Sequence, residues 1–121
     1  MQFRSKLIAP SIKTGTIDTC ATEQTKLMQD IILVENGYYK FSFDMCKNEW
    51  ETCNYFSSSI GTQQMYNMEK ICIDKCITYQ KYFRWYKSES SSVLFLGYNY
   101  NYLTVGCTYG PLLDNVSLIQ F

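Results

Sequence analysis

Six cysteines in 121 residues constrain the fold of this chain more than any other feature. An even number of cysteines in a short chain is typical of a secreted domain held together by disulfides. Free thiols in a cytosolic protein and a zinc site are the alternatives. A zinc site needs closely spaced pairs of ligands, which only Cys72 and Cys76 provide, and the chain has no histidine. The cysteines are Cys20, Cys46, Cys53, Cys72, Cys76 and Cys107.

The composition excludes several classes of function. With 46% hydrophobic and 17% aromatic residues, the chain can bury enough apolar surface to fold. Eleven basic residues balance eleven acidic ones, so nucleic acid is not an expected partner. The lack of histidine removes the Ser-His-Asp and Cys-His nucleophile systems, and we expect neither catalysis nor a cofactor.

The expected location is extracellular. No apolar stretch approaches the roughly 18 residues that span a bilayer, so we expect no membrane insertion. The apolar run Leu7–Pro10 is too short for a secretory signal, which implies that a signal has been removed and that Met1 is an expression start. The triplet Asn115-Val116-Ser117 is a sequon, which predicts N-glycosylation at Asn115.

Hydrophobic spacing predicts a mixture of helices and strands. Apolar residues at steps of three and four predict a short helix over Thr22–Val34 and a long one over about 64–86. Alternation over Tyr38–Met45 predicts a half-buried strand, and a further short strand is expected near Phe3–Ile8. Ser57–Ser59 with Gly61, and the serine-rich stretch 87–92, are interpreted as loops. Residues 93–96 and 98–109 are interpreted as two strands.

These elements predict an α+β fold, a small disulfide-rich domain with a short antiparallel sheet and one long helix. Residues 1–19 would form an extended arm and 20–87 the disulfide-rich core. Residues 88–121 would form a β-hairpin extension that a disulfide ties back. We expect a monomer.

The segment from Cys20 to Cys76 resembles a divergent Kunitz domain of the salivary or venom inhibitor type. The resemblance rests on the aromatic strand Tyr38-Tyr39-Lys40-Phe41, on the run from Cys46 to Cys53, and on the Cys72-x-x-x-Cys76 spacing. It covers about half of the chain and lacks the cysteine that pins the family's binding loop. It implies the pairs Cys20–Cys76 and Cys46–Cys72, which leave Cys53 to bond with Cys107.

The expected function is non-catalytic binding of an extracellular protein, by protease inhibition or by channel or receptor blockade. Tyr98, Tyr100 and Tyr102 are the candidate contact residues, because tyrosine offers broad, rigid contact area. The resemblance adds Lys26 as the basic residue for a trypsin-like pocket.

Two other classes of function remain open. One is a helical carrier of a small apolar ligand, which requires a helical 93–109 region. The other is a small hydrolase that pairs Asp44 with Glu49 or Glu51.

Overall fold

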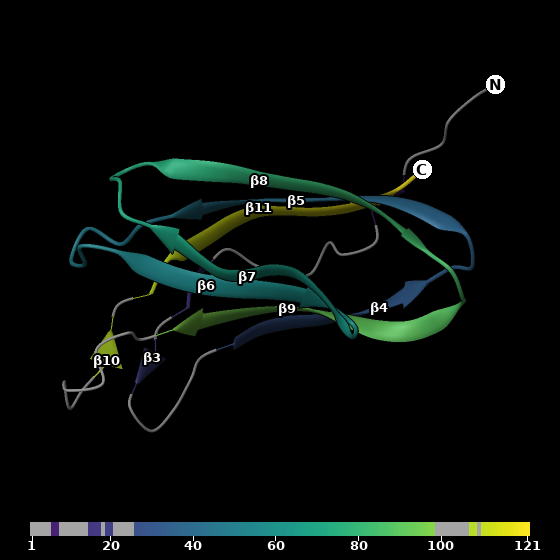
Figure 1. Cartoon of the computed structure of the whole chain (residues 1–121), viewed down its shortest axis with the longest axis horizontal. Coiled ribbons are helices and arrows are strands. Elements are labelled where there is room, and N and C mark those ends of the chain that lie inside the picture. Colours follow the sequence, from purple (N-terminus) through teal and green to yellow (C-terminus); the bar gives the residue numbers. More distant parts are fainter. Residues whose placement is uncertain (1–5, 8–14, 18, 21–25, 99–106, 109) are drawn as a thin grey trace.

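The chain folds as a sandwich of two antiparallel β-sheets (Figure 1). The computed structural model describes residues 6–7, 15–17, 19–20, 26–98, 107–108 and 110–121. One layer, here the β5 sheet, has the order β1-β11-β5-β8, with β2 also paired to β11. The other, here the β9 sheet, has the order β4-β9-β6-β7. A separate small ladder joins β3 to β10.

The strand bounds are as follows. The β5 sheet contains β1 (Lys6–Leu7), β2 (Gly15–Thr16), β5 (Gly37–Cys46), β8 (Cys76–Trp85) and β11 (Leu112–Gln120). The β9 sheet contains β4 (Lys26–Leu33), β6 (Asn54–Ile60), β7 (Gln63–Ile71) and β9 (Glu89–Tyr98). The small ladder contains β3 (Thr19–Cys20) and β10 (Cys107–Thr108).

Aromatic side chains from both sheets fill the space between the layers. Every second residue of β5 points inward, and Tyr39, Phe41 and Phe43 are at most 1% exposed. Phe43 lies near the centre, where its ring meets that of Phe95 from β9 edge-on with centroids 4.9 Å apart. Burying such a ring contributes about 1.5–3 kcal/mol, so this core supplies the main stabilising term. The predicted strand Tyr38–Met45 is confirmed as part of β5.

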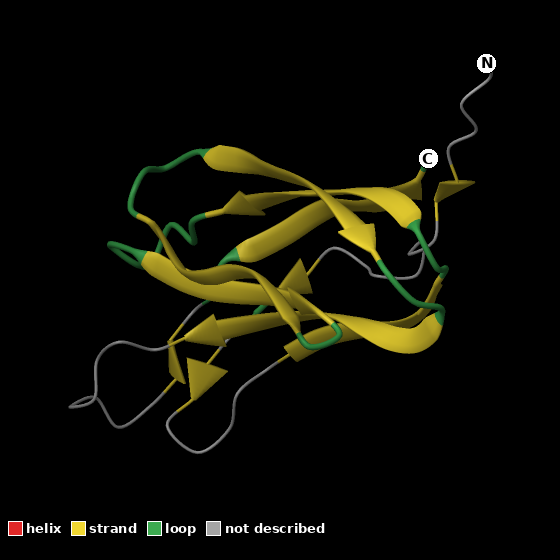
Figure 2. Ribbon diagram, turned by 45° about the vertical axis from the view of Figure 1, so that its right-hand side comes forward, coloured by secondary structure: helices red, strands yellow, loops and turns green. Residues whose placement is uncertain are grey.

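The predicted α+β fold is wrong, because every described element is a strand (Figure 2). The segment 64–86, expected to be one helix, forms β7 and β8 with a turn at 72–75. Its β-branched and aromatic residues favour strands, and the inward residues of β8 recur with a period of two at Ile77, Tyr79, Lys81, Phe83 and Trp85. Among the described residues there is no helix that could span a membrane.

The prediction of a helix over Thr22–Val34 is also wrong for residues 26–34, the part of this segment that the structure describes. Residues 26–33 form β4, in which Ile31 and Leu33 are buried while Ile32 is 70% exposed. The helical spacing was misleading because apolar side chains occur on both faces of this strand.

The serine-rich stretches lie largely in strands rather than loops, although residues 87 and 88 form part of the connection between β8 and β9. Ser57 and Ser58 are buried within β6, whereas Gly61, also part of the expected loop, does lie in a turn and has a positive φ of 58°. Ser90–Ser92 belong to β9, which lies between β4 and β6. The segment expected to form a C-terminal extension thus supplies internal strands to both sheets, β9 to one and β11 to the other.

The disulfides differ from those that the Kunitz resemblance implies. Cys46 bonds to Cys76 and Cys53 bonds to Cys72, with sequence separations of 30 and 19 residues. Cys46 and Cys76 face each other in the β5–β8 register, while Cys53 precedes β6 and Cys72 follows β7. Both bridges therefore fasten the same end of the sandwich. The backbone register of β3 and β10 makes residues 20 and 107 partners.

Candidate functional site

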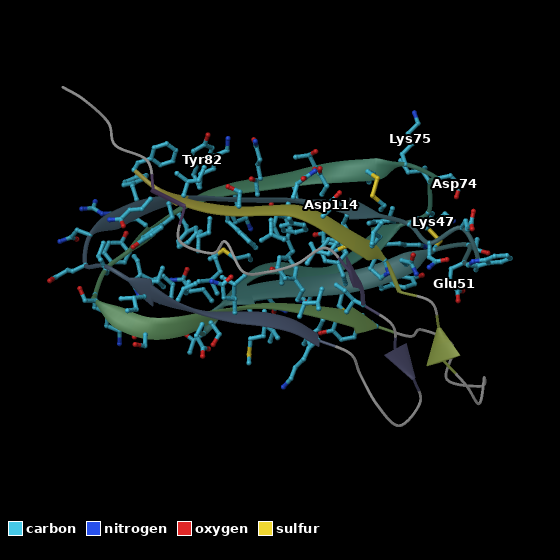
Figure 3. The ribbon with its side chains drawn as sticks, turned by 180° about the vertical axis from the view of Figure 1, so that it is seen from behind. Lys47, Glu51, Asp74, Lys75, Tyr82 and Asp114 are labelled. Carbon is cyan, nitrogen blue, oxygen red and sulfur yellow. A yellow bond between two sulfur atoms is a disulfide. The ribbon has the colours of Figure 1, made fainter. Side chains whose placement is uncertain are left out.

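Four aromatic side chains are exposed on the outer side of the β5 sheet, at the end away from the disulfides. Tyr38, Tyr82, Tyr86 and Phe121 are 53%, 59%, 70% and 45% exposed. Figure 3 shows Tyr82 at one end of the molecule and Lys47, Glu51, Asp74 and Lys75 at the other. Exposed apolar groups collected on one face commonly mark an interaction surface. We call these four residues, with Lys40 and Arg84, the aromatic face.

The register of three strands assembles the aromatic face. Lys40 on β5 faces Tyr82 on β8, and Tyr38 faces Arg84. The backbone N–H of Phe121, just after β11, donates to the carbonyl of Tyr38. Because alternate residues of a strand share a side of the sheet, these side chains all lie on the outer surface.

Ring stacking and cation–π contacts order the side chains of the aromatic face. The Tyr82 and Phe121 rings stack with centroids 6.1 Å apart. The Arg84 guanidinium lies between two rings, with Cζ 5.9 Å from the Tyr38 centroid and 5.7 Å from that of Tyr86. Lys40 Nζ lies 5.8 Å from the Tyr82 centroid. Such contacts hold long side chains in place at exposed sites.

A cavity adjoins the aromatic face. It has a volume of about 400 Å³, and Tyr86 belongs to both the cavity and the face. Its other lining residues are Thr62, Gln63, Trp85, Lys87 and Glu89. Lys87 and Glu89 form an ion pair at 3.5 Å. A ligand on the aromatic face could therefore continue past Tyr86 into this cavity.

The opposite end of the sandwich carries a rigid loop between β5 and β6. The side chain of Lys47 is only 5% exposed, and its Nζ donates to the carbonyls of Asn48 and Glu51 at 2.9 and 2.5 Å. It also lies 2.7 Å from an Asp74 carboxylate oxygen in the turn between β7 and β8. Trp50 is 74% exposed on this loop. The two disulfides and Lys47 thus fix a loop that presents a tryptophan.

The carboxylates proposed for a hydrolase do not form an acid–base pair. Asp44, on the outer side of β5, accepts hydrogen bonds from Asn115 Nδ2 at 2.8 Å and from the Thr78 hydroxyl at 2.6 Å. These two bonds hold the pKa of Asp44 below its usual value of 3.8. A general acid needs a raised pKa, so this environment opposes that role. Glu49 and Glu51 lie on the loop beyond β5.

Of the contact residues predicted from sequence, the two that the structure describes, Tyr98 and Lys26, do not belong to the aromatic face. Tyr98 ends β9, where its hydroxyl forms a hydrogen bond of 2.9 Å with the hydroxyl of Ser57 on β6, the neighbouring strand of the β9 sheet. Lys26 is exposed at the start of β4 in the same sheet. Tyr100 and Tyr102 lie outside the described residues. Whether Tyr98 and Lys26 contact a target remains a prediction.

Asn115, the predicted glycosylation site, is exposed in the β11 bulge with a positive φ of 51°. Its side-chain nitrogen is already bonded to Asp44. In the part of the chain with described side chains, no group of three or more cysteines and carboxylates could hold a metal ion.

Sequence reasoning missed the aromatic face because it assigned 64–86 to a helix. The alternating outward residues Gln80, Tyr82 and Arg84 were the available signal. A period of two at these positions predicts a strand with aromatic and basic side chains on its outward side.

Comparison with known proteins gives structural likeness only. No protein-family description matches the chain, and no curated protein matches its sequence. Among solved structures, the CBM22-1 xylan-binding domain from Paenibacillus barcinonensis is similar, with a TM-score of 0.51 and 8% identity; the match covers 96% of this chain and 85% of that one.

A second similar structure is an exo-β-1,3-galactanase from Phanerochaete chrysosporium, crystallised with β-1,3-galactotriose. The TM-score is 0.50 with 11% identity over 98% of this chain. The match spans only 29% of the galactanase chain. At these identities the comparisons establish a shared β-sandwich fold.

Proposed function

We propose that this chain is a non-catalytic, extracellular binding module that holds a carbohydrate on its aromatic face. The observation that carries the proposal is the clustering of Tyr38, Tyr82, Tyr86 and Phe121, each at least 45% exposed, on one side of a sheet. A sugar ring presents C–H groups on its faces and hydroxyls around its rim. The electron-rich faces of aromatic rings attract the C–H groups.

The polar residues around the rings suit the hydroxyl groups of a sugar. Arg84 and Lys40 supply charged donors, and Gln80 and Ser42 lie in the next cross-strand pair along the same surface. Binding sites for small polar molecules combine apolar surface with a few fixed polar groups in this way. The similar structures support the proposal, because one is described as a xylan-binding domain and the other was crystallised with a galactotriose.

Two disulfides support an extracellular location, because such bonds persist in oxidising compartments. The environment of Asp44 supports a non-catalytic role, since its two hydrogen bonds favour the ionised form and leave it poorly suited to proton transfer.

A glycan array followed by titration calorimetry tests the proposal. We expect Tyr82→Ala to weaken binding of the best glycan about tenfold or more, since aromatic anchors dominate binding energy. Ile32→Ala is the matched control, because Ile32 is 70% exposed on the outer side of the other sheet. The absence of any glycan ligand, or an equal loss in both variants, would rule out this site.

A protein partner at the disulfide end is the second candidate. Trp50 on its fixed loop favours it, because a rigid exposed tryptophan is a frequent anchor in protein interfaces. Trp50→Ala separates the two candidates: it should leave glycan binding unchanged if the aromatic face is the site. Loss of glycan binding in Trp50→Ala with retention in Tyr82→Ala would move the site to the disulfide end.

A further inference from the structure

We propose that the carbohydrate is acidic, an oligosaccharide that carries carboxylate or sulfate groups. This inference rests on the proposed function and concerns the charge of the same surface. Its basis is the placement of two cationic side chains, Lys40 and Arg84, among the exposed rings of the aromatic face.

Neither cation forms an ion pair within the part of the chain that the structure describes. The ion pairs found there are Lys47–Asp74 at the other end and Lys87–Glu89 beside the cavity. Asp44, on the same side of β5, is four residues from Lys40, a distance of about 14 Å along a strand. That distance exceeds the Debye length of roughly 8 Å at physiological salt, so Asp44 barely offsets the charge of Lys40.

The Arg84 guanidinium is arranged to bind an anion. Two tyrosine rings flank it, and its described hydrogen bond is a long one, from Nη2 to Asn36 Oδ1 at 3.5 Å. The planar fork of donors on arginine matches two oxygens of a carboxylate or a sulfate. Because the rings already restrict the side chain, less conformational entropy is lost on binding.

The extent of the surface favours an oligosaccharide over a single sugar. The Lys40–Tyr82 and Tyr38–Arg84 pairs occupy neighbouring rows of the sheet, about 7 Å apart along the strands, and Phe121 extends the second row. The cavity of about 400 Å³ beside Tyr86 extends the surface further. Several sugar units could therefore lie along the rings, with acidic groups meeting Arg84 and Lys40.

Matched pairs of glycans that differ in charge test this inference. Titration calorimetry would compare oligogalacturonate with its methyl ester, and dextran sulfate with dextran. We expect the acidic member of at least one pair to bind about tenfold or more tightly, and its affinity to fall as salt is raised. The pair that shows the preference identifies the group, carboxylate or sulfate.

Variants locate the effect. Lys40→Gln and Arg84→Gln together should remove the preference for the acidic member, while Lys26→Gln, an exposed lysine on the other sheet, should keep it. Thermal unfolding checks that each variant is folded. Equal binding of acidic and neutral members would overturn the inference and leave the proposed function standing. Binding of no glycan would overturn both, and an acidic preference that survives the double variant would overturn the role of these two residues.

Discussion

The rings of Tyr82 and Phe121 stack over the strand that separates their own strands. Tyr82 belongs to β8 and Phe121 follows β11, and β5 lies between these strands in the sheet. Their centroids are 6.1 Å apart with an interplanar angle of 26°. The stack thus links three strands on the outer surface, where it can serve both sheet stability and ligand contact.

A double-mutant cycle on Tyr82→Ala and Phe121→Ala measures this stack. We expect a coupling of about 0.5 kcal/mol in the free energy of unfolding, the low end for aromatic pairs, because both rings are partly in water. Urea unfolding of the four proteins gives the value. A cycle of Tyr82→Ala with Ile32→Ala, from opposite sheets, should give no coupling, and coupling within error of zero for the stacked pair would contradict the geometry.

The buried ammonium of Lys47 should matter more for stability than its acidic partner. Replacing Lys47 by Met leaves two backbone carbonyls without their charged donor, which costs about 1.5–3 kcal/mol for a hydrogen bond of this kind. Asp74→Asn should cost less than about 1 kcal/mol, because the Asp74 side chain is 83% exposed. Chemical denaturation compares the two variants, and a larger loss in Asp74→Asn would show that the carboxylate, rather than the carbonyls, holds the lysine.

The sequence predicts β5 well and β8 poorly, for one physical reason. In β5, inward Phe41 and Phe43 alternate with Ser42 and Asp44, so the pattern distinguishes core from solvent. In β8, inward Phe83 has the outward neighbour Tyr82, so both sides look apolar and the period is hidden. Outward aromatic residues such as Tyr82 make this surface a candidate site, and they also hide the alternation that would have identified β8 as a strand.

The disulfide pairing could not be predicted for a related reason. Cys46 meets Cys76 because β5 and β8 pair in one register, and spacing along the chain contains no information about register. The helical interpretation placed Cys72 and Cys76 on one face, whereas the turn between β7 and β8 separates them.

Non-reducing peptide mapping should recover Cys46–Cys76 and Cys53–Cys72. With those four paired, full oxidation leaves residues 20 and 107, whose strands are in register, and we expect a third bridge between them. Recovery of Cys46–Cys72 instead would contradict the β5–β8 pairing.

Removing each of the two described bridges should lower stability by a similar amount. The sequence separations of 19 and 30 residues correspond to about 3.2 and 3.6 kcal/mol in the chain-entropy treatment. Denaturation of the Cys53→Ala/Cys72→Ala and Cys46→Ala/Cys76→Ala double variants gives the two losses. A negligible loss in both would show that the bridges do not restrict the unfolded chain.

The two tryptophans should differ sharply in fluorescence. Trp50 is 74% exposed and Trp85 is 4% exposed. In Trp50→Phe, the remaining emission from Trp85 should be blue-shifted and weakly quenched by acrylamide. In Trp85→Phe, the emission from Trp50 should be red-shifted and strongly quenched. Similar quenching in both variants would contradict the inward position of Trp85 on β8.

The titration of Asp44 tests the hydrogen bonds at the centre of the outer surface. Asn115 contributes most to lowering its pKa below 3.8, and Thr78 contributes next. Asn115→Gly, which tolerates the positive φ, should therefore raise the pKa more than Thr78→Val does. Carboxyl chemical shifts followed by NMR against pH give both values, and the reverse order would assign the main bond to Thr78.

The same shift fixes the direction of the pH dependence. Because the pKa of Asp44 is lower in the folded chain, its ionised form stabilises the fold at pH values above the unfolded pKa. That contribution decreases as the pH falls through the pKa that Asp44 has in the folded chain. Below that pH, Asp44 is protonated in both the folded and the unfolded chain. Asp44→Asn should therefore flatten the loss of stability in acid while changing the neutral-pH value modestly, because the side chain is mostly in water. Thermal unfolding between pH 2 and 7 measures this, and an unchanged acid limb would show that Asp44 is not linked to folding.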